Sequence, residues 1–464
     1  MKPSFGKRLT PEARTYAIRE LARRARVQRD FFNSWKIEVG EKDTVLTLGA
    51  QSRRVIFRHA PEGPFQGKCS SRIPVALASW MAAPSDEILK ADLVLPFVTP
   101  SENKAPLFLQ KEEGTFVCQL DVLLSTVFTL ARVEEMFAHA ADPYGRFPAS
   151  ASVAAHHGFL ERPIVDEYGT ALAQVIKALL PAWDPIPAFR RVKVTHDIDN
   201  VGFPFQLRTA IGHTIRRRRP AATIKDAVAN FTGAETTELG LVRELAEISK
   251  SRGLRSAFFW KGSPAGPHDS GYDPFHPKIQ RVIADLKREG FEQGVHPGYD
   301  SFGDRSRLRT EVELLTRALG TAKLGGRQHY LRWTPQTWLD WEACGLVYDS
   351  TLGFADAIGF RAGTSVPYRP WQLEQNRELN LIEVPLTVMD CTTVKYMALS
   401  KPEALARIRE CAKRVALANG VFTLLWHNSP LIDPEYDGWY EPVLDSVASD
   451  AKDYQLPCTP AELW

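Results

Sequence analysis

Residues 192–200 read Val-Lys-Val-Thr-His-Asp-Ile-Asp-Asn, and the rest of the chain is organised around them. Two valines flanking a lysine in the first half are typical of a short buried strand. The second half places His196, Asp197 and Asp199 within four residues. Neighbouring carboxylates repel each other and are costly to desolvate unless a cation or hydrogen-bond donors compensate them. Taken alone, the stretch fits a capped turn after a strand as well as it fits a functional site.

The length and composition indicate a globular protein of two or three domains. Its 464 residues are 44% hydrophobic and 24% charged, which is enough for sizeable cores. The net charge of +3 is too small to indicate a nucleic-acid partner. The arginine run at residues 216–219 fits a solvated loop or helix face, and an anionic ligand or a membrane head group would also suit it.

Cysteine usage and hydropathy give no sign of a secreted or membrane-spanning protein. The six cysteines are scattered without a CxxC pair, so we expect neither a disulfide framework nor a zinc finger. The first residues lack the apolar core of a signal peptide, and no apolar run is long enough to cross a bilayer. We therefore expect no transmembrane segment and a cytoplasmic location, with peripheral association at a membrane left open.

The first part of the chain is expected to form a smaller α+β domain over residues 1–185. Thr10 and Pro11 mark a helix start, with an N-cap hydroxyl followed by a proline in the first turn. Strands are expected over residues 45–48, 54–57 and 92–98, and helices over residues 121–138 and 165–180. These residues contain no catalytic constellation, so the role of this domain stays open.

Residues 186–464 alternate between strand and helix patterns, which implies a parallel sheet. Strands are expected over residues 192–195, 256–260, 293–296, 327–331, 346–350, 383–388 and 421–426. Helices are expected between them, over residues 238–252, 278–289, 305–319, 334–344 and 402–419. About seven repeats favour a distorted (β/α) barrel over an open sheet. No GxGxxG follows a predicted strand, so a dinucleotide site has no support.

Polar residues follow five of these predicted strands. They are His196, Asp197 and Asp199 after the first strand, His296 after another, Arg327, His329 and Arg332 on or past a third, Asp349 at the end of a fourth and His427 after a fifth. The carboxyl ends of parallel barrel strands converge on one rim, where such folds place their chemistry. One such histidine alone is more simply a core residue, but five strands converging in this way indicate an active site.

The residue types suit a divalent metal. Imidazole and carboxylate ligands without a nearby cysteine favour Zn²⁺, and Co²⁺ or Mn²⁺ would also fit. A metal with open positions lowers the pKa of water and polarises an acyl oxygen. A second carboxylate can accept the proton of the water, and a histidine can protonate the leaving group. The chemistry that fits is the hydrolysis of an amide or an ester.

Over residues 190–430 the chain resembles the polysaccharide deacetylase superfamily, the metal-dependent carbohydrate esterases of family four and their relatives. That family's first motif is commonly Thr-Phe-Asp-Asp-Gly, and residues 195–199 resemble a Thr-His-Asp-Val-Asp variant of it. The resemblance implies that Asp197 is the catalytic base and Asp199 a metal ligand. Residues 359–364 and 383–390 resemble a bacterial subfamily in which an uncharacterised domain precedes the barrel.

The family's second motif pairs two metal-binding histidines four residues apart. His296 matches the first, but position 300 is an aspartate, so this chain departs from the pattern. Either Asp300 or His329 supplies the third ligand, and we prefer His329 because residues 299–301 also fit a turn.

The remaining motifs imply further roles. Residues 327–330, Arg-Gln-His-Tyr, resemble the third motif, so Arg327 belongs to the catalytic set and the backbone N–H of Tyr330 would help hold the oxyanion. Asp349 resembles the fourth motif and would orient Arg327. His427 resembles the general acid of the fifth. Arg332 on the rim and Arg361 in the subfamily phrase are assigned to substrate binding.

The sequence thus predicts a metal-dependent hydrolase that removes an N-acyl group, most simply N-acetyl, from a carbohydrate or glycan precursor. One alternative is hydrolysis of a small non-sugar amide, because the superfamily covers such substrates too. The other is a catalytically degenerate barrel that serves as a scaffold in surface-polysaccharide assembly, which the aspartate at position 300 would suit. The substrate, the physiological metal and the oligomeric state are left open.

Overall fold

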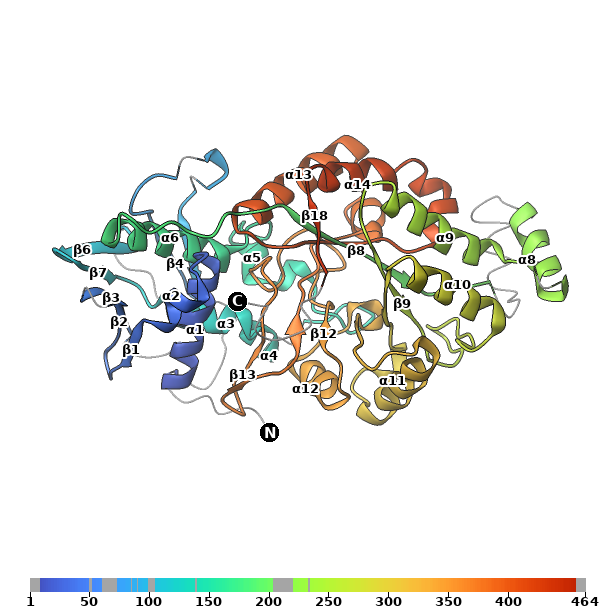
Figure 1. Cartoon of the computed structure of the whole chain (residues 1–464), viewed down its shortest axis with the longest axis horizontal. Helices are drawn as coiled ribbons and strands as arrows, with labels where there is room; N and C mark the ends of the chain where they lie inside the picture. The colour runs from blue at the N-terminus through green and yellow to red at the C-terminus, as the bar shows by residue number, and fades with distance from the viewer. Residues whose placement is uncertain are drawn as a thin grey trace.

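Figure 1 shows the computed structural model of the chain, in which residues 9–49, 52–60, 73–84, 86–89, 91–98, 105–137, 140–202, 220–232 and 234–455 are described. The arginine run at residues 216–219, Cys69 and Cys458 lie outside these ranges. The first part of the chain, coloured blue to cyan, carries its own sheets at the left of the view, and a curled parallel sheet occupies the rest.

The first part contains a five-stranded sheet with the order β1-β2-β3-β7-β6, in which only β3 and β7 pair in parallel. Its strands are β1 (Lys36–Val39), β2 (Asp43–Leu48), β3 (Arg53–Arg58), β6 (Phe108–Glu112) and β7 (Thr115–Cys118). A separate antiparallel pair is formed by β4 (Val75–Ala78) and β5 (Leu93–Pro96). Strands therefore form over the three segments in which the alternation of apolar residues predicted them.

Helices pack between these sheets and the rest of the molecule. They are α1 (Pro11–Arg24), α2 (Arg29–Asn33), α3 (Val122–Leu130), α4 (Val133–Phe137), α5 (Val153–His156) and α6 (Ile164–Leu179). The predicted cap of α1 is confirmed, because Thr10 Oγ1 accepts a hydrogen bond of 3.2 Å from the N–H of Ala13. The expected single helix over residues 121–138 is wrong. It breaks between α3 and α4, where Arg132 adopts a left-handed φ of 53° and forms an ion pair of 2.6 Å with Glu134.

The rest of the chain forms a parallel sheet with the order β15-β12-β11-β10-β9-β8-β17-β16, and β18 pairs beside β8. The strands are β8 (Arg191–Ile198), β9 (Ala257–Trp260), β10 (Glu292–Val295), β11 (Gly325–Gly326), β12 (Tyr348–Asp349), β15 (Ile382–Glu383), β16 (Val388–Met389), β17 (Phe422–Leu425) and β18 (Lys452–Asp453). Within the described residues, β15 and β16 do not pair with each other. The expected distorted barrel is thus confirmed in its coarse form, as a sheet that curls without closing.

Two predicted strands differ from the observed ones. Residues 327–331 form no strand, because β11 already ends at Gly326 and His329–Leu331 is a 3-10 turn. Residues 383–388 split into β15 and β16, which lie at opposite ends of the sheet. The backbones of β10 and β11 approach each other closely, since a Cβ at Gly326 would overlap the carbonyl oxygen of Val295.

Helices cover the outside of the parallel sheet, except that the first of them, at residues 220–232, lies at the right edge of the view, beside the helix that follows it (Figure 1). They are α8 (Pro220–Thr232), α9 (Thr237–Lys250), α10 (Pro277–Arg288), α11 (Arg305–Leu319), α12 (Pro335–Ala343), α13 (Lys401–Leu417) and α14 (Tyr440–Ala448). A short antiparallel pair, β13 (Trp371–Gln372) and β14 (Arg377–Glu378), lies apart from the sheet. None of the described helices is long and apolar enough to cross a bilayer.

One continuous hydrophobic core runs through both parts of the chain, and buried ion pairs fasten them together. Arg24 of α1 pairs with Asp166 of α6 at 2.9 Å and donates to the Thr364 hydroxyl at 3.0 Å. Arg361 pairs with Glu135 at 2.6 Å. Burying such charges is costly unless every partner is in place, so these contacts specify one way of docking the first part against the barrel.

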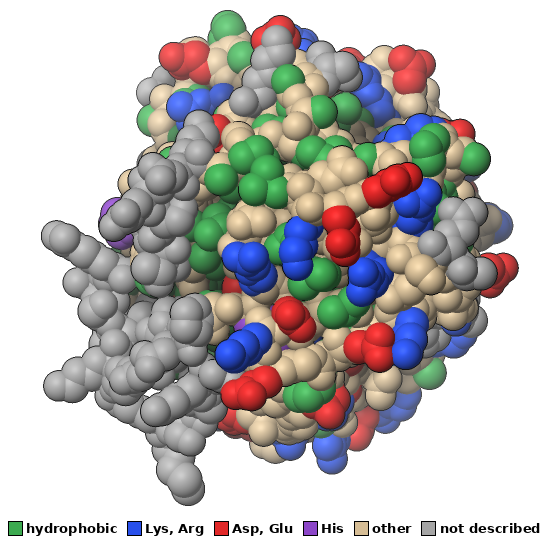
Figure 2. Space-filling view, turned by 90° about the vertical axis from the view of Figure 1, so that its left-hand side faces the viewer, with side chains coloured by type: hydrophobic (Ala, Val, Ile, Leu, Met, Phe, Trp, Pro, Cys, Tyr) green, Lys and Arg blue, Asp and Glu red, His purple; other side chains and the backbone are tan. Residues whose placement is uncertain are grey.

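Figure 2 views the molecule from the left-hand side of Figure 1. Among the side chains drawn in colour, acidic and basic groups are interspersed over this face instead of gathering by sign. This distribution of the coloured side chains agrees with the small net charge of +3.

Candidate active site

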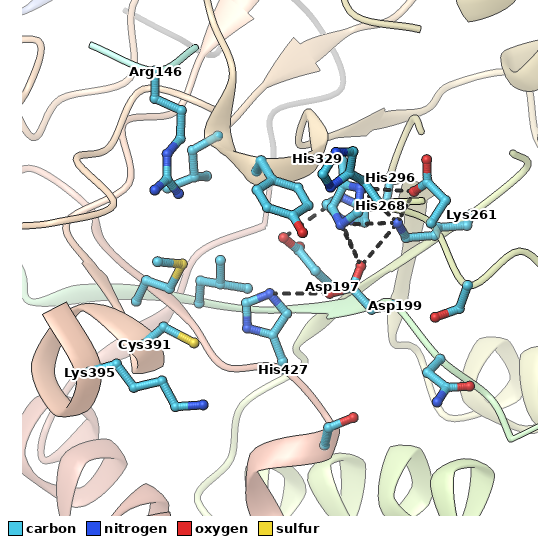
Figure 3. Close-up of a pocket in the computed structure, with 18 of the residues that line it drawn as sticks. Arg146, Asp197, Asp199, Lys261, His268, His296, His329, Cys391, Lys395 and His427 are labelled. Atoms are coloured by element: carbon cyan, nitrogen blue, oxygen red, sulfur yellow. Dashed lines mark hydrogen bonds and ion pairs between the residues drawn. The ribbon is translucent and has the colours of Figure 1, made fainter. Parts of the chain in front are cut away.

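A cavity of about 700 Å³ opens at the carboxyl ends of the parallel strands. Its lining includes Tyr330 and five of the nine residues that the sequence placed on the rim: Asp197, Asp199, His296, His329 and His427. Figure 3 shows these side chains around one space, with Arg146 of the first part of the chain reaching it from another side. The strand ends therefore converge as the barrel argument predicts.

Strand β8 carries the paired carboxylates. It continues to Ile198, so the alternation of a strand directs Asp197 and Asp199 toward the same side. His196 lies on the opposite side, where its Nδ1 is 2.7 Å from the carbonyl oxygen of Trp426 and its ring packs on Phe258. Burial lowers the pKa of His196 to about 4, so this imidazole is neutral at physiological pH.

Arg327 holds Asp197 in place. The guanidinium is fully buried, and its Nη1 donates to Asp197 Oδ1 at 2.9 Å and to the hydroxyl of Thr195 at 2.9 Å. Its Nε donates to the carbonyl of Ser350 at 2.9 Å, which fixes the fork from the other side. Oδ2 of Asp197 lies 3.7 Å from His296 Nδ1. A carboxylate fixed by one oxygen can present the other one to a reactant.

Asp199, His296 and His329 have the geometry of a metal site. Asp199 Oδ1 lies 3.3 Å from His296 Nε2 and 3.2 Å from His329 Nε2, and one ligand atom from each residue lies within 4.8 Å of the others. Bonds of 2.0–2.1 Å at tetrahedral angles separate ligand atoms by about 3.3 Å. Among the described residues, His296 Nε2 is also a buried atom without a hydrogen-bond partner, which suits an atom that binds a metal.

Neighbouring groups orient both imidazoles. His296 Nδ1 is 2.8 Å from the carbonyl oxygen of Arg327, and His329 Nδ1 is 2.9 Å from Asp269 Oδ1. These acceptors assign the proton to Nδ1 in each ring, which leaves the Nε2 lone pairs directed at Asp199. A metal-binding histidine is commonly oriented in this way by a carbonyl or a carboxylate.

The alternative third ligand, Asp300, is far from suitable. Its side chain is 68% exposed and lies 3.6 Å from Arg307 on the surface. The choice between Asp300 and His329 that the sequence left open therefore favours His329, whose imidazole lies with the other two candidate ligands.

Two charged residues of the site were not predicted from the sequence. Lys261 Nζ lies 3.2 Å from Asp199 Oδ1, 3.1 Å from His329 Nε2 and 2.5 Å from Asp269 Oδ1. Lys261 directly follows β9, so it could have been predicted from the same pattern of polar residues at the carboxyl ends of strands. Asp269 lies in a loop whose sequence carries no comparable signal.

Lys261 and His329 control the charge of Asp199. Burial alone would raise the pKa of its carboxyl, but Lys261 and His329 outweigh burial and hold the pKa well below the usual range. Asp199 is therefore an anion at any physiological pH, as a metal ligand must be. The same ammonium contacts two of the three candidate ligand atoms, so a metal would have to share them with Lys261.

Replacing Lys261 by methionine is expected to strengthen Zn²⁺ binding by about tenfold or more, because removing a cation beside the ligands removes its repulsion of the metal. A competition titration against a chromophoric chelator measures the dissociation constant. The matched control is Lys287→Met, since Lys287 contacts the carbonyl oxygen of Leu319, outside the cavity. Unchanged or weaker binding in Lys261→Met would show that the ammonium supports the ligands instead of competing with the metal.

His427 follows β17 and forms a dyad with Asp390. Its Nδ1 lies 3.0 Å from Asp390 Oδ2, and its backbone N–H donates to the same oxygen at 2.7 Å. Its Nε2 lies 3.7 Å from Asp199 Oδ2, on the side of the cavity. Burial opposes the charged imidazole, but Asp390 outweighs it and raises the pKa of His427 to about 9. The imidazole is therefore protonated near neutral pH and able to donate a proton.

Asp390 was not assigned a role from the sequence, although it ends the phrase at residues 383–390. The expected strand over residues 383–388 left it two positions beyond a strand end. In the structure β16 ends at Met389, so Asp390 follows a strand directly, like the other rim residues.

Asp390→Asn is expected to move the basic limb of the pH profile of kcat downward by more than one unit, from about pH 9 toward the ordinary histidine value of 6.5. Activity that needs protonated His427 is lost as pH rises through its pKa, and removing the anion lowers that pKa. Asp433→Asn is the matched control, because Asp433 lines the same cavity but accepts from the N–H of Glu435. A basic limb that stays in place would exclude the dyad as its origin.

Three sequence assignments receive no support from their surroundings. Asp349 accepts hydrogen bonds from the backbone N–H and hydroxyl of Thr351, and no hydrogen bond or ion pair joins it to Arg327 within the described residues. Arg327 is oriented by Asp197 and Ser350 instead. Burial raises the pKa of Asp349 to about 7, so its charge is not even permanent at neutral pH.

The two arginines assigned to substrate binding lie outside the lining of the cavity. Arg332 donates to the carbonyl of Tyr299 at 2.9 Å and stacks on its ring. Arg361 is buried against Glu135. Both side chains are engaged by other parts of the protein, so we do not propose that they contact the substrate.

Tyr330 lines the cavity in an unusual backbone conformation. Its φ is 61° and that of Leu331 is 56°, both in the left-handed region that non-glycine residues rarely adopt. Such conformations concentrate at functional sites, where the surrounding structure holds them. The assignment of its N–H to the oxyanion stays a prediction.

Comparison with known proteins gives a match to part of the chain only. Residues 60–181 match a family of unknown function, DUF7033, which is less than half of the chain. No curated protein matches the sequence.

Solved structures resemble the chain distantly. A provisionally assigned polysaccharide deacetylase from Mycobacterium smegmatis is 17% identical with a TM-score of 0.38, covering 58% of this chain and 86% of its own. A second one from Bordetella bronchiseptica, involved in O-antigen biosynthesis, is 14% identical with a TM-score of 0.30, covering 56% and 91%. A 4-alpha-glucanotransferase from Thermococcus litoralis is 13% identical with a TM-score of 0.35, covering 59% and 38%. Similarities this low assign no activity.

Proposed function

We propose that this protein is a metal-dependent hydrolase that removes an N-acyl group, most simply acetyl, from a carbohydrate. The observation that carries the proposal is the convergence on one cavity of a fixed carboxylate, a three-residue ligand set and a charged histidine. Asp197 Oδ2 lies 3.7 Å from one candidate ligand residue, His296, and His427 Nε2 lies 3.7 Å from another, Asp199. A general base and a general acid on either side of a metal site are what hydrolysis of an amide requires.

The ligand set supports a divalent ion on its own chemistry. Two imidazole nitrogens and one carboxylate oxygen form a ligand set that Zn²⁺ accepts in catalytic sites, and Co²⁺ or Mn²⁺ would also fit. Asp199, His296 and His329 would hold the ion, and Asp269 would orient His329 from behind. When bound, such an ion supplies Lewis acidity, which polarises a carbonyl group and lowers the pKa of water.

The protein's own groups then divide the proton transfers. Asp197 accepts a proton from the attacking water, since Arg327 occupies only one of its oxygens. The carbonyl carbon becomes tetrahedral, and we assign the Tyr330 N–H to its developing oxyanion, a donor typically worth about 3 kcal/mol of barrier. His427, kept charged by Asp390, donates its Nε2 proton to the departing amine. The C–N bond breaks, and the products are a free amine and a carboxylate.

The substrate class rests on the motif resemblance together with the character of the cavity. Tyr330 and Tyr396 present aromatic rings to the cavity, and polar groups make up much of the remaining lining. Aromatic faces interleaved with hydrogen-bonding groups suit a sugar ring better than a purely apolar amide.

A substrate panel tests the proposal. N-acetylated sugars, their phosphorylated and nucleotide-linked forms, and small non-sugar amides are incubated with protein loaded with Zn²⁺, Co²⁺ or Mn²⁺, and acetate and free amine are measured. We expect release from a sugar substrate that stops when a chelator is added. Release from small amides alone would support the rival substrate class, and no bound metal with no activity would support a scaffold.

A further inference from the structure

Arg146 brings a cation into the cavity from the first part of the chain. Residues 142–146 form a tight turn in which the N–H groups of Tyr144 and Arg146 donate to Asp142. The Arg146 side chain is only 7% exposed, yet it lines the cavity together with the residues of the barrel. A buried arginine in a wall of the site needs a reason, because few arginines are buried without a dedicated partner.

The partners of Arg146 hold its guanidinium without using all of its donors. Nε donates to Asp142 Oδ2 at 2.6 Å, and Nη2 donates to the hydroxyl of Tyr396 at 3.0 Å. The guanidinium also lies 5.0 Å from the ring centre of Tyr144 and 5.3 Å from that of Tyr396. Among the described residues, Nη1 has no hydrogen-bond partner. The planar guanidinium of Arg146 is thus held by two aromatic rings while its Nη1 donors remain available to a ligand.

Lys395 supplies a second cation to the lining of the cavity, at another edge than Arg146. It lies on the short π-helix Thr392–Tyr396 and lines the cavity with Arg146. Its nearest carboxylate, Glu435, is 3.8 Å away, and both side chains are about half exposed or more. A pair this open and this long contributes little, so the ammonium remains available to another anion.

The two cations stand apart from the metal site. Figure 3 shows Arg146 at the upper left and Lys395 at the lower left of the cavity, while the candidate metal ligands cluster at the right. The carboxylates on the right are already committed to Arg327, Lys261 and the imidazoles. Asp433, which also lines the cavity, acts as a cap and accepts from the N–H of Glu435 at 3.1 Å.

We propose that Arg146 binds an anionic group of the substrate, a phosphate or a carboxylate, while the acyl group lies at the metal site, and that Lys395 attracts the same anion from another edge of the cavity. The substrate of the proposed hydrolase is then a negatively charged N-acyl sugar derivative, and the first part of the chain completes the active site by supplying Arg146. The guanidinium fork matches the oxygens of either anion, and its prior fixation lowers the entropy lost on binding. The substrate statement rests on the proposed function, whereas the anion site does not.

Binding of inorganic phosphate to the full-length protein tests the anion site without any turnover. Isothermal titration calorimetry compares the wild type with Arg146→Gln, Lys395→Met and Arg409→Gln at equal metal content, so that any contribution of the metal is common to all. We expect the dissociation constant to rise about tenfold or more in Arg146→Gln, which loses a charged donor, and by about threefold in Lys395→Met, which loses a more distant charge. Arg409→Gln, an exposed cation on α13 outside the cavity, should bind as the wild type does.

Arg146→Lys and circular dichroism guard against misfolding. The lysine keeps the charge without the fork, so its affinity should lie between those of the wild type and Arg146→Gln. If Arg146→Gln does not fold, Lys395→Met decides, since its half-exposed side chain is not needed for the core. No phosphate binding by the wild type, or wild-type affinity in folded Arg146→Gln and Lys395→Met, overturns the proposal.

A second comparison identifies the source of the anion. Dissociation constants are measured for N-acetylglucosamine, its 1-phosphate and N-acetylmuramic acid, which carries a carboxylate. Tighter binding of either charged sugar than of the neutral one by tenfold supports the proposal, and equal affinities for all three overturn it. If no substrate is hydrolysed by any metal-loaded form, the proposed reaction fails while these binding results still stand.

Discussion

Asp197→Asn is expected to lower kcat by about two to four orders of magnitude while the protein keeps its metal, because a general base typically contributes that much. Asparagine can still accept the hydrogen bond of 2.9 Å that Arg327 donates to position 197, so the buried guanidinium is not left without a partner. The amide cannot accept a proton from water. The loss should therefore fall on the chemical step and leave the metal ligands undisturbed.

Single-turnover kinetics and the zinc content by mass spectrometry measure the two halves of this prediction. Asp300→Asn is the matched control, since it makes the same change at an exposed carboxylate that lies beside Arg307. It should keep wild-type activity and metal content. If Asp197→Asn retains its activity, another group removes the proton. If it loses the metal, Asp197 is a ligand and not the base.

His296→Ala is expected to weaken Zn²⁺ binding by at least about a hundredfold and to abolish activity. Its Nε2 is a buried atom 3.3 Å from Asp199 Oδ1 and has no hydrogen-bond partner among the described residues, and β10 carries no histidine that could replace it. Loss of an orienting group behind a ligand typically costs about 10–100-fold. Asp269→Asn, which affects only the support of His329, should therefore weaken binding less than His296→Ala does.

Equilibrium zinc titration with a chelating indicator ranks these variants. His157→Ala serves as the control, because this exposed histidine caps α5, away from the cavity. Equal zinc affinities in the wild type and His296→Ala would remove the metal site from the proposal. A larger effect in Asp269→Asn than in His296→Ala would mean that Asp269 is itself a ligand.

Local rules predicted those parts of the fold where side chains act on their own segment. The hydroxyl of Thr10 caps α1 as expected, and the apolar spacing over residues 305–319 gives the helix α11 with the predicted bounds. The local rules failed where the pairing of backbone segments depends on residues that are distant in the sequence. The strands β11, β12, β15 and β16 have two residues each, which is too short for any periodicity to be read. The break at Arg132 depends on ion pairs that no spacing reveals.

The same division holds for the site. Asp199, His296 and His329 were predicted from strand ends and motif resemblance, and the structure brings their ligand atoms together. Asp390 and Lys261 also follow strands, so the signal was present but was not used. Asp349 and Arg361 match motifs of the resembled family, but Asp349 bonds to Thr351 and Arg361 pairs with Glu135, and neither residue lines the cavity.

The stretch at residues 192–200 determined by itself that a buried strand ends in two carboxylates facing one side, because alternation along a strand is a local property. Which carboxylate is free to bind a metal was decided only by the tertiary structure. Arg327, more than a hundred residues away, occupies Asp197, while two imidazoles and Lys261 surround Asp199. The entry of Arg146 into the cavity also required the tertiary structure. The reason is physical: hydrogen-bond partners and charges act through space, and the order of residues along the chain does not specify which distant groups meet.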